Sequence, residues 1–438
     1  MKAPFGVAIV GCGTVGNAVA KLLLSQSSML FERTGQQISL RALVDIDFDR
    51  ARAAGLDEGL FRENFTAVLA DERIHLIIET VGGLSIARTI IEKSLKAGKH
   101  VVSANKALLA NYGTEIFELA RKNGVCIGFE ASCAGGIPIV RALVDGLLAN
   151  SNEAIYGVVN GTANFILTEM VRNAKSYGDA LKQAQADGIA EADSNLDVNG
   201  MDSAHKLTLL GSLAFGARIS LDEIPVEGID SLNSFDVSAG LELGYVPKLL
   251  AIGCQTKKGL ELAVRPAFLA ETHPLARVSG VFNAISVYGS DVGHTMYYGR
   301  GAGGRATASA VVSDVISIAL GTWQVLFSKL SIWPDRGRKI QIADFGESTH
   351  RQYLRFLVKD RSGVVAKITA VLASRNISIK VFVLREDRHP SNLVPIVITT
   401  YEAREKDISE AMKSIIAMPP VDKDAARIPI IDEQMESN

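Results

Sequence analysis

A glycine motif near the N-terminus constrains this chain more than any other feature. Residues 11–16 read Gly-Cys-Gly-Thr-Val-Gly, follow the apolar run 7–10, and precede a helical pattern with Ala18, Val19 and Leu22 on one face. G-x-G-x-x-G alone is a weak signal, but a dinucleotide-binding βαβ unit has this motif between a strand and a helix. The motif therefore predicts a parallel α/β domain in preference to a plain glycine-rich turn.

Each glycine of the motif has a separate physical task in such a unit. Gly11 permits a tight turn, Gly13 lets backbone N–H groups approach a pyrophosphate at the positive helix N-terminus, and Gly16 lets the helix pack closely on the strand. We take these three residues, together with Thr14 and Val15, as candidate cofactor-binding residues. The predicted ligand is NAD or NADP.

An acidic residue at the end of the next predicted strand bears on the choice between these two cofactors. Asp45 can accept hydrogen bonds from the adenosine ribose and repel a 2'-phosphate, which favours NAD. It lies further along than the ~20 residues of the usual fingerprint, because residues 25–37 form an apparent insertion. Arg50 and Arg52 stand close enough to pair with a 2'-phosphate, so NADP stays open; a solvated charged turn also explains all three residues.

Length and charge limit the remaining possibilities. The 438 residues exceed what one hydrophobic core organises, so we expect two or three domains. With 46 Lys and Arg against 48 Asp and Glu, no bulk basic field exists to attract nucleic acid. Four scattered cysteines without a CxxC pair favour a reducing, cytoplasmic setting. The N-terminus imitates a signal peptide, but its glycines break the apolar helix, and no membrane association is expected.

The pattern of strands and helices changes twice along the chain. The first third alternates short β-branched runs with amphipathic stretches, which is typical of a Rossmann-type parallel sheet. Longer helices and strands then indicate an α+β domain, and a final β-α-β-β-α-β order suits a ferredoxin-like fold. The predicted parts are a first domain at 1–134 with a helix at 308–329 packing back on it, a second domain at 135–307, a linker at 333–349 and a third domain at 350–438.

Lys106 lies just past a predicted strand of the first domain. Ligands of open α/β sheets bind at the carboxyl ends of the strands, where a lysine can polarise or protonate a substrate oxygen. A surface lysine at a helix start explains the same segment equally well.

The densest group of ionisable residues lies at 188–206. Asp202 and Lys206 are four residues apart, so they share one face of a predicted helix. That helix carries no further charge, so Lys206 projects from a mostly buried element, where a lysine needs a partner. Its ammonium can pass a proton to a carbonyl oxygen as hydride arrives, while Glu191 and Asp197 can hold a substrate ammonium. The alternative is an exposed ion pair worth about 0.2 to 0.5 kcal/mol.

Two loops of small residues offer backbone atoms to a ligand. Segment 130–138 can gather carbonyl groups around a hard monovalent cation, or it can be a tight interdomain turn. Its Cys133 suggests a thiol nucleophile of an aldehyde-oxidising dehydrogenase, although no histidine or cation is visible nearby to activate it. The second loop, 299–305, precedes a helix and can close over the nicotinamide or serve as a flexible turn.

These motifs, in this order, resemble the homoserine dehydrogenase family along the whole chain. The matching elements are the glycine motif, Asn105-Lys106, the loop 130–138, Gly-Thr-Ala-Asn-Phe at 161–165 and, as the most specific, the block 191–206. The resemblance implies reversible reduction of L-aspartate 4-semialdehyde to L-homoserine with NAD(P)H, in threonine, methionine and isoleucine biosynthesis. It also implies that the second domain serves catalysis and dimerisation.

Roles for single residues follow from the same resemblance. Lys206 corresponds to the family's proton donor, Lys106 to a second catalytic lysine near the cofactor, and Asp202 to the acid that positions Lys206. Gly303 corresponds to a glycine near the nicotinamide. The substrate-binding residues implied are Thr162, Glu191, Asp197 and Asp202. A sodium or potassium ion would be held mainly by the main-chain carbonyls of Glu130, Cys133, Gly135 and Ile137.

Residues from about 353 to 431 resemble an ACT domain, a module that often binds a regulatory amino acid between paired copies. The resemblance implies a homodimer or homotetramer, with threonine as the possible effector. Two other functions stay open: a thiol-dependent semialdehyde dehydrogenase acting through Cys133, and an amino-acid sensor with a decayed dehydrogenase body. Intact Glu191, Asp202, Lys106 and Lys206 weigh against decay.

Overall fold

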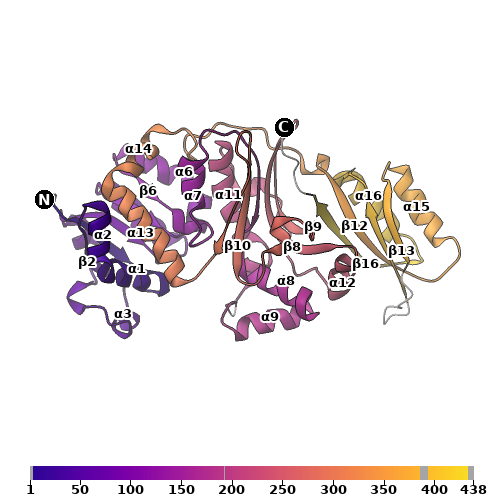
Figure 1. Cartoon of the computed structure of the whole chain (residues 1–438), viewed down its shortest axis with the longest axis horizontal. Helices are drawn as coiled ribbons and strands as arrows, with labels where there is room; N and C mark the ends of the chain where they lie inside the picture. The colour runs from indigo at the N-terminus through magenta and orange to yellow at the C-terminus, as the bar shows by residue number, and fades with distance from the viewer. Residues whose placement is uncertain (1–2, 192, 385–392, 433–438) are drawn as a thin grey trace. The chain divides into compact units, whose positions relative to one another are not determined.

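The computed structural model describes residues 3–191, 193–384 and 393–432. The chain forms two units, and each unit is assembled from three separate stretches of sequence. Figure 1 labels the helices and strands along the chain. Unit 1 consists of Met1–Ile155, Asp202–Ile224 and Val281–Ile340, and unit 2 consists of Tyr156–Met201, Pro225–Gly280 and Gln341–Asn438.

Unit 1 contains a six-stranded sheet in the order β3-β2-β1-β4-β5-β6, in which all neighbouring strands are parallel. The strands are β1 (Phe5–Val10), β2 (Ile38–Val44), β3 (Phe61–Arg62), β4 (Ile74–Glu79), β5 (His100–Ser103) and β6 (Ile127–Gly128). The central strands are buried almost throughout, as expected of a parallel sheet covered on both faces. The predicted Rossmann-type sheet is confirmed.

The helices of unit 1 connect these strands and continue beyond them. They are α1 (Thr14–Ser25), α2 (Ser27–Thr34), α3 (Asp49–Ala53), α4 (Phe65–Ala70), α5 (Ser85–Lys96), α6 (Lys106–Lys122), α7 (Ile139–Arg141) and α11 (Met201–Phe215, in this unit from Asp202). One apolar cluster shows why α4 and α5 pack on the sheet: Val68 and Ile90 lie against Val10, Val44 and Ile77. An antiparallel hairpin, β10 (Phe282–Gly289) with β11 (Gly293–Arg300), also belongs to unit 1.

The segment expected as one helix over 308–329 forms two helices, α13 (Gly304–Leu320) and α14 (Thr322–Lys329). Gly321 separates them with a φ of 86°, a left-handed conformation that ends the first helix, and the two axes differ by 86°. Within the described residues, no single helix is long and apolar enough to cross a membrane, and only this bent pair passes on length and composition together.

Unit 2 contains strands in the order β8-β9-β16-β12-β14-β13. They are β8 (Tyr245–Thr256), β9 (Gly259–Ala270), β12 (Thr349–Val358), β13 (Ile379–Leu384), β14 (Val394–Thr400) and β16 (Val421–Ile431). Its helices are α8 (Gly161–Asn173), α9 (Tyr177–Ala186), α10 (Asn195–Val198), α12 (Ser234–Glu242), α15 (Val364–Ser374) and α16 (Glu405–Ile416). Strand β7 (Asn152–Val158) spans the boundary between the units.

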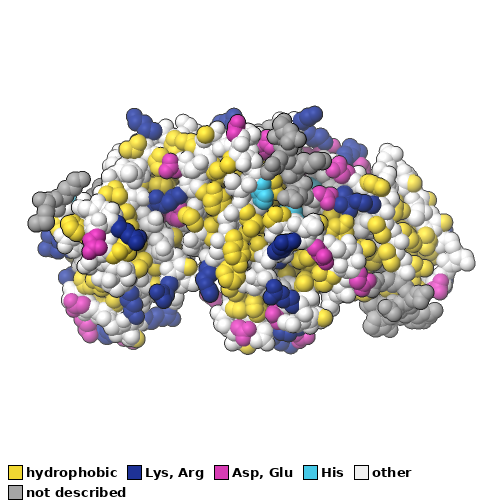
Figure 2. Space-filling model, in the orientation of Figure 1, with side chains coloured by type: hydrophobic (Ala, Val, Ile, Leu, Met, Phe, Trp, Pro, Cys, Tyr) yellow, Lys and Arg dark blue, Asp and Glu magenta, His cyan; other side chains and the backbone are white. Residues whose placement is uncertain are grey.

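The last part of unit 2 follows the predicted β-α-β-β-α-β order with one added two-residue strand, β15 (Ala403–Arg404), which pairs with β12. Its apolar core includes Leu354, Ile368, Ile398 and Ile408. Strand β16 is longer than the predicted 428–431 and pairs in parallel with β9 through its last two residues. The strands of the third predicted domain therefore extend the sheet that contains the β8–β9 hairpin of unit 2. On the face drawn in Figure 2, basic and acidic side chains are interspersed over the surface.

Candidate active site

The loop 11–16 joins β1 to α1, and its glycines are required by close contacts. Gly11 has a φ of 103°, and a Cβ there would lie 2.7 Å from the carbonyl carbon of Thr80. A Cβ on Gly16 would lie 1.9 Å from the carbonyl oxygen of Gly11. At Gly13, no described atom lies within 4 Å of the Cβ position. The space beside Gly13 is therefore open to a ligand.

The start of α1 suits the pyrophosphate of a dinucleotide. Gly13 is the N-cap residue, and among the described residues no side chain caps this helix and no acid lies in its first turn. The first N–H groups of a helix lack partners within the helix and carry partial positive charge. The N–H groups of Thr14, Val15 and Gly16 can therefore donate to phosphate oxygens.

Asp45 lies beside the same loop. Its carboxylate accepts a hydrogen bond from the N–H of Cys12 at 2.5 Å, so it lies where the ribose of a bound dinucleotide is expected. Arg52, the possible partner of a 2'-phosphate, pairs instead with Asp49 at 3.1 Å and with Glu58 at 3.5 Å. These contacts engage Arg52 within its own segment, and the preference for NAD over NADP stays a prediction.

A second helix begins next to α1. Gly303, the N-cap residue of α13, has a φ of 113°, and a Cβ on Gly304 would lie 3.2 Å from the carbonyl oxygen of Thr14. As at α1, no side chain of the described residues caps α13, and its first turn contains no acid. The two helix N-termini therefore lie together in unit 1, which places Gly303 close to the expected cofactor loop.

Two lysines share one buried carboxylate in unit 1. On α11, the ammonium Nζ of Lys206 lies 2.7 Å from Oδ2 of Asp202 one turn earlier. The Nζ of Lys106, the first residue of α6, lies 3.0 Å from Oδ1 of the same carboxylate. The side chains of Lys206 and Asp202 are 9% exposed and that of Lys106 is 37% exposed, so one side of the cluster reaches solvent.

The charges of this cluster stabilise one another. Burial alone would raise the pKa of Asp202, but the ammonium groups of Lys206 and Lys106 outweigh it and lower the pKa well below its usual range. The carboxylate is therefore ionised and holds both lysines, and the three groups together carry a positive charge. Such a cluster can stabilise negative charge on a reacting oxygen. Burial lowers the pKa of the neighbouring His205, which favours its neutral form.

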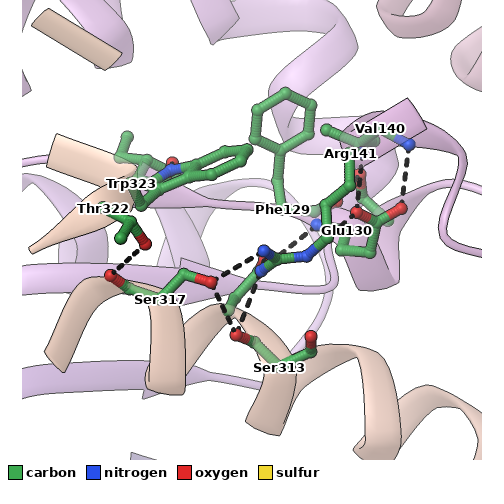
Figure 3. A network of polar contacts seen from close by, with 11 residues as sticks. Phe129, Glu130, Val140, Arg141, Ser313, Ser317, Thr322 and Trp323 are labelled. Atoms are coloured by element: carbon green, nitrogen blue, oxygen red, sulfur yellow. Dashed lines mark hydrogen bonds and ion pairs between the residues drawn. The ribbon is translucent and has the colours of Figure 1, made fainter. Parts of the chain in front are cut away.

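A buried polar network holds the loop 130–137 (Figure 3). The carboxylate of Glu130 accepts the N–H groups of Val140 at 2.8 Å and Arg141 at 2.9 Å. Asp314 of α13 accepts the N–H of Glu130 at 2.8 Å and pairs with Arg141 at 2.9 Å. Burial raises the pKa of both carboxyl groups. Sequence reasoning missed Arg141 and Asp314, because 173 residues separate them and no local pattern connects them.

The proposed cation site and the possible thiol nucleophile lie in this same loop. Cys133 is fully buried, and burial raises the pKa of its thiol to about 12, so a nucleophilic thiolate is strongly disfavoured. The carbonyls of Glu130 and Ile137 each accept one backbone hydrogen bond, from Cys133 and Ile139, which leaves each oxygen a second lone pair. With Gly135, these neutral oxygens fit a monovalent ion, and the site stays a prediction.

The other substrate-binding candidates lie in unit 2. Asp197 of α10 accepts a hydrogen bond from the side-chain amide of Asn160 at 2.8 Å. Thr162, the second residue of α8, donates its hydroxyl to the carbonyl oxygen of Ile189 at 3.3 Å. Glu191 is exposed. The start of α8 and the segment 189–197 are therefore tied together, while the lysine cluster belongs to unit 1.

Comparison with known proteins identifies the family of the chain. Three family models match in succession: the NAD-binding domain of homoserine dehydrogenase at 11–130, homoserine dehydrogenase at 138–316 and the ACT domain at 352–419. The homoserine dehydrogenase of Neisseria gonorrhoeae is 40% identical over 99% of both chains, and that of Pseudomonas aeruginosa is 37% identical over 97% of this chain and 98% of its own.

Two solved structures extend the comparison. A homoserine dehydrogenase from Thiobacillus denitrificans is 38% identical and covers 98% of both chains with a TM-score of 0.92. A hyperthermophilic archaeal homoserine dehydrogenase in complex with NADPH is 27% identical and covers 73% of this chain and 98% of its own, with a TM-score of 0.61.

The parallel sheet with its open glycine loop, together with the charged lysine cluster, defines an oxidoreductase that uses a nicotinamide cofactor. The sequence identity of 40% to the Neisseria gonorrhoeae enzyme, over 99% of both chains, narrows this class of oxidoreductases to one family. The chain belongs to the homoserine dehydrogenase family, and the predicted resemblance and ACT domain are confirmed.

Proposed function

We propose that this enzyme reduces L-aspartate 4-semialdehyde to L-homoserine, reversibly, in the biosynthesis of threonine, methionine and isoleucine. The observation that carries the proposal is the buried Asp202 carboxylate between two lysines, 2.7 Å from Lys206 and 3.0 Å from Lys106. A reduced nicotinamide supplies the hydride when bound. Lys206 donates a proton from Nζ to the aldehyde oxygen, Asp202 orients it, and Lys106 stabilises charge on that oxygen.

The substrate and cofactor contacts extend this proposal. Glu191 and Asp197 bind the substrate ammonium group, and Asp202 and Thr162 are further substrate-binding residues. Asp45 binds the ribose, which supports NAD as the preferred cofactor, and a sodium or potassium ion is held by the loop 130–137. For Asp197, support comes from the side-chain amide of Asn160, which donates a hydrogen bond to the Asp197 carboxylate and holds it in place.

The direct test is turnover by the purified protein. With L-aspartate 4-semialdehyde present, the absorbance of NADH or NADPH should fall, and homoserine should accumulate in equal amount. NADH should give the higher kcat/KM, and Asp45→Ala should narrow the difference between the two cofactors. No oxidation of either cofactor would contradict the proposed reaction, and a higher kcat/KM with NADPH would contradict the NAD preference alone.

Cys133→Ala separates this mechanism from thiol catalysis. The side chain is fully buried and its thiol pKa is raised to about 12. The variant should therefore keep kcat within about twofold, whereas removal of a covalent nucleophile costs several orders of magnitude. Loss of activity with the fold retained, judged by circular dichroism, would favour the thiol mechanism.

Regulation and assembly belong to the same proposal. The ACT module supports threonine as a feedback effector and a homodimer or homotetramer as the assembly. Four free cysteines, three of them buried, support a reducing cytoplasmic setting. Calorimetric titration with threonine, methionine and isoleucine tests the effector, and light scattering measures the assembly. Heat of binding from none of the three amino acids would remove threonine feedback.

A further inference from the structure

A buried arginine in unit 2 connects the ACT module to a segment of the catalytic part. Arg265 lies on β9, and its side chain is 3% exposed. Its Nη1 donates to Oε1 of Glu405, the first residue of α16, at 2.9 Å. Its Nη2 lies 3.3 Å from Oε2 of Glu227. One guanidinium therefore neutralises a carboxylate on each side.

The ACT side of this contact is fixed by further bonds. The side chain of Glu405 is 2% exposed and also accepts the amide of Gln352 on β12 at 2.8 Å and the guanidinium of Arg427 on β16 at 3.0 Å. A charge-assisted network of this kind in a buried site is stronger than isolated bonds. The position of Glu405, and with it that of Arg265, therefore depends on two strands of the ACT module.

The other side leads to the substrate-binding segment. Glu227 donates its N–H to the carbonyl of Val264 at 2.7 Å, directly before Arg265. Two residues later, Ile229 donates its N–H to the carbonyl of Val198 at 2.8 Å. A Cβ on Gly228 would lie 2.5 Å from that same carbonyl oxygen, so the two segments meet without space between them.

Val198 directly follows Asp197 in α10, and Asn160 holds Asp197 at 2.8 Å. The contacts therefore run without interruption from Glu405 through Arg265 and Glu227 to Asp197. We propose that Arg265 is a positioning residue through which Glu405 of the ACT module sets the affinity of the site for its substrate. The inference rests on the proposed function, because it takes Asp197 as a substrate-binding residue.

The test is a KM-against-kcat comparison on the full-length enzyme. Arg265→Met and Glu405→Gln should each raise the KM for L-aspartate 4-semialdehyde about three- to thirtyfold. The KM for NAD(P)H should not change, since Arg265 acts on the substrate segment alone, and kcat should stay within about threefold. Arg265→Lys, which keeps the charge, should restore part of the substrate affinity.

Arg355→Met is the matched control. This arginine is also 3% exposed and also pairs with two carboxylates, Asp236 at 2.8 Å and Asp424 at 2.9 Å, on α12 and β16. The variant removes a buried ion pair of the same unit outside the contacts that lead to Asp197. It should lower the unfolding midpoint and leave the substrate KM unchanged. If Arg355→Met raised the substrate KM as much as Arg265→Met does, the effect of Arg265→Met would reflect a general loss of stability. That result would overturn the inference.

Glu227→Gln keeps the inference testable if the buried variants fail to fold, because its side chain is 45% exposed. It should raise the substrate KM, and with Glu405→Gln the combined effect should be non-additive, since both act through Arg265. An unchanged substrate KM in Glu227→Gln, or strict additivity, would overturn the inference. If the unmodified enzyme does not reduce the semialdehyde, the proposed function fails instead.

Discussion

The buried carboxylates at Asp202 and Asp314 are each paired with basic side chains, and some of those partners are distant in sequence. Asp202 faces two lysines, and Asp314 faces Arg141. Removing one member of a buried pair leaves an uncompensated charge, at a cost of about 3 to 5 kcal/mol. Such pairs are therefore rigid points of the structure. The cluster at Asp202 holds two ammonium groups on one carboxylate, and its Lys106 is 37% exposed, so it is the one suited to react.

Lys206→Met should remove the proton donor. The expected result is a fall in kcat of about 10² to 10⁴, the contribution typical of general acid catalysis, with little change in the KM for NAD(P)H. Lys99→Met is the control, because Lys99 is another buried lysine of unit 1 whose acceptors, among the described residues, are the carbonyls of Asp71 and Ile74. It should lower stability and keep kcat. Steady-state kinetics measure kcat for both variants. Normal turnover in Lys206→Met would contradict the role of Lys206 as the proton donor.

The sequence predicts part of this site for a physical reason. Asp202 and Lys206 are four residues apart, so helical geometry alone brings them together, and their 2.7 Å contact agrees. The contact of Lys106 with Asp202 joins residues far apart in sequence, and no periodicity reveals it. The ion pair between Arg141 and Asp314 is even harder to predict, because neither residue lies in a motif and their pairing depends on how α13 packs.

At the scale of single elements, Gly16 allows the first turn of α1 to pack closely against the loop that precedes it. Gly16→Ala should abolish cofactor binding or raise the KM for NAD(P)H more than tenfold, because its Cβ would lie 1.9 Å from the Gly11 carbonyl oxygen. Gly113→Ala in α6 is the control: no described atom lies within 4 Å of its Cβ position, so the change should stabilise the helix by about 0.5 to 1 kcal/mol. Cofactor fluorescence titration and urea unfolding measure the two effects. Unchanged cofactor affinity in Gly16→Ala would contradict this account.

Strand β5 carries a pH-dependent contact. His100 accepts the N–H of Cys126 at 3.2 Å, and burial together with nearby His75 lowers the pKa of His100 to about 4. The unfolded chain, with a pKa near 6.5, binds the proton first, so stability falls as the pH drops from about 6.5 to about 4. The loss is at most about 3 kcal/mol. Urea unfolding at pH 7 and pH 4.5 should show a smaller pH dependence for His100→Gln than for the unmodified protein; equal dependence would contradict the assignment.

Periodicity predicted most elements, and the exceptions have local causes. The helix 201–215 and the central strands of the parallel sheet agree with their apolar patterns, whereas the two-residue edge strand β3 was not predicted. The bend at Gly321 was missed because apolar residues continue on both sides of it. The first half of β16, from Val421, was missed because its residues are mostly exposed and polar, so their strand conformation depends on pairing with β12.

At the scale of the whole molecule, the ACT module is part of the fold of unit 2. Ile430 and Ile431 of β16 pair with Phe268 and Leu269 of β9, which extends one sheet from the module into the hairpin. Sequence reasoning gave the module its order of elements but not this attachment, because pairing between separate strands leaves no local signal. The archaeal relative, whose chain covers 73% of this one, shows that the fold tolerates a shorter chain.

Removal of residues 345–438 should therefore destabilise this particular chain. The edge of β9 would lose β16, Phe268 would lose its ring contact with Tyr353 at 5.2 Å, and the charge of Arg265 would lose Glu405. An unpaired strand edge and an exposed aromatic favour association between chains. The truncated protein should aggregate or unfold at a lower temperature, by light scattering and thermal unfolding. Phe268→Thr in the truncated chain should reduce the aggregation, and an unchanged midpoint without aggregation would contradict the view that the module stabilises unit 2.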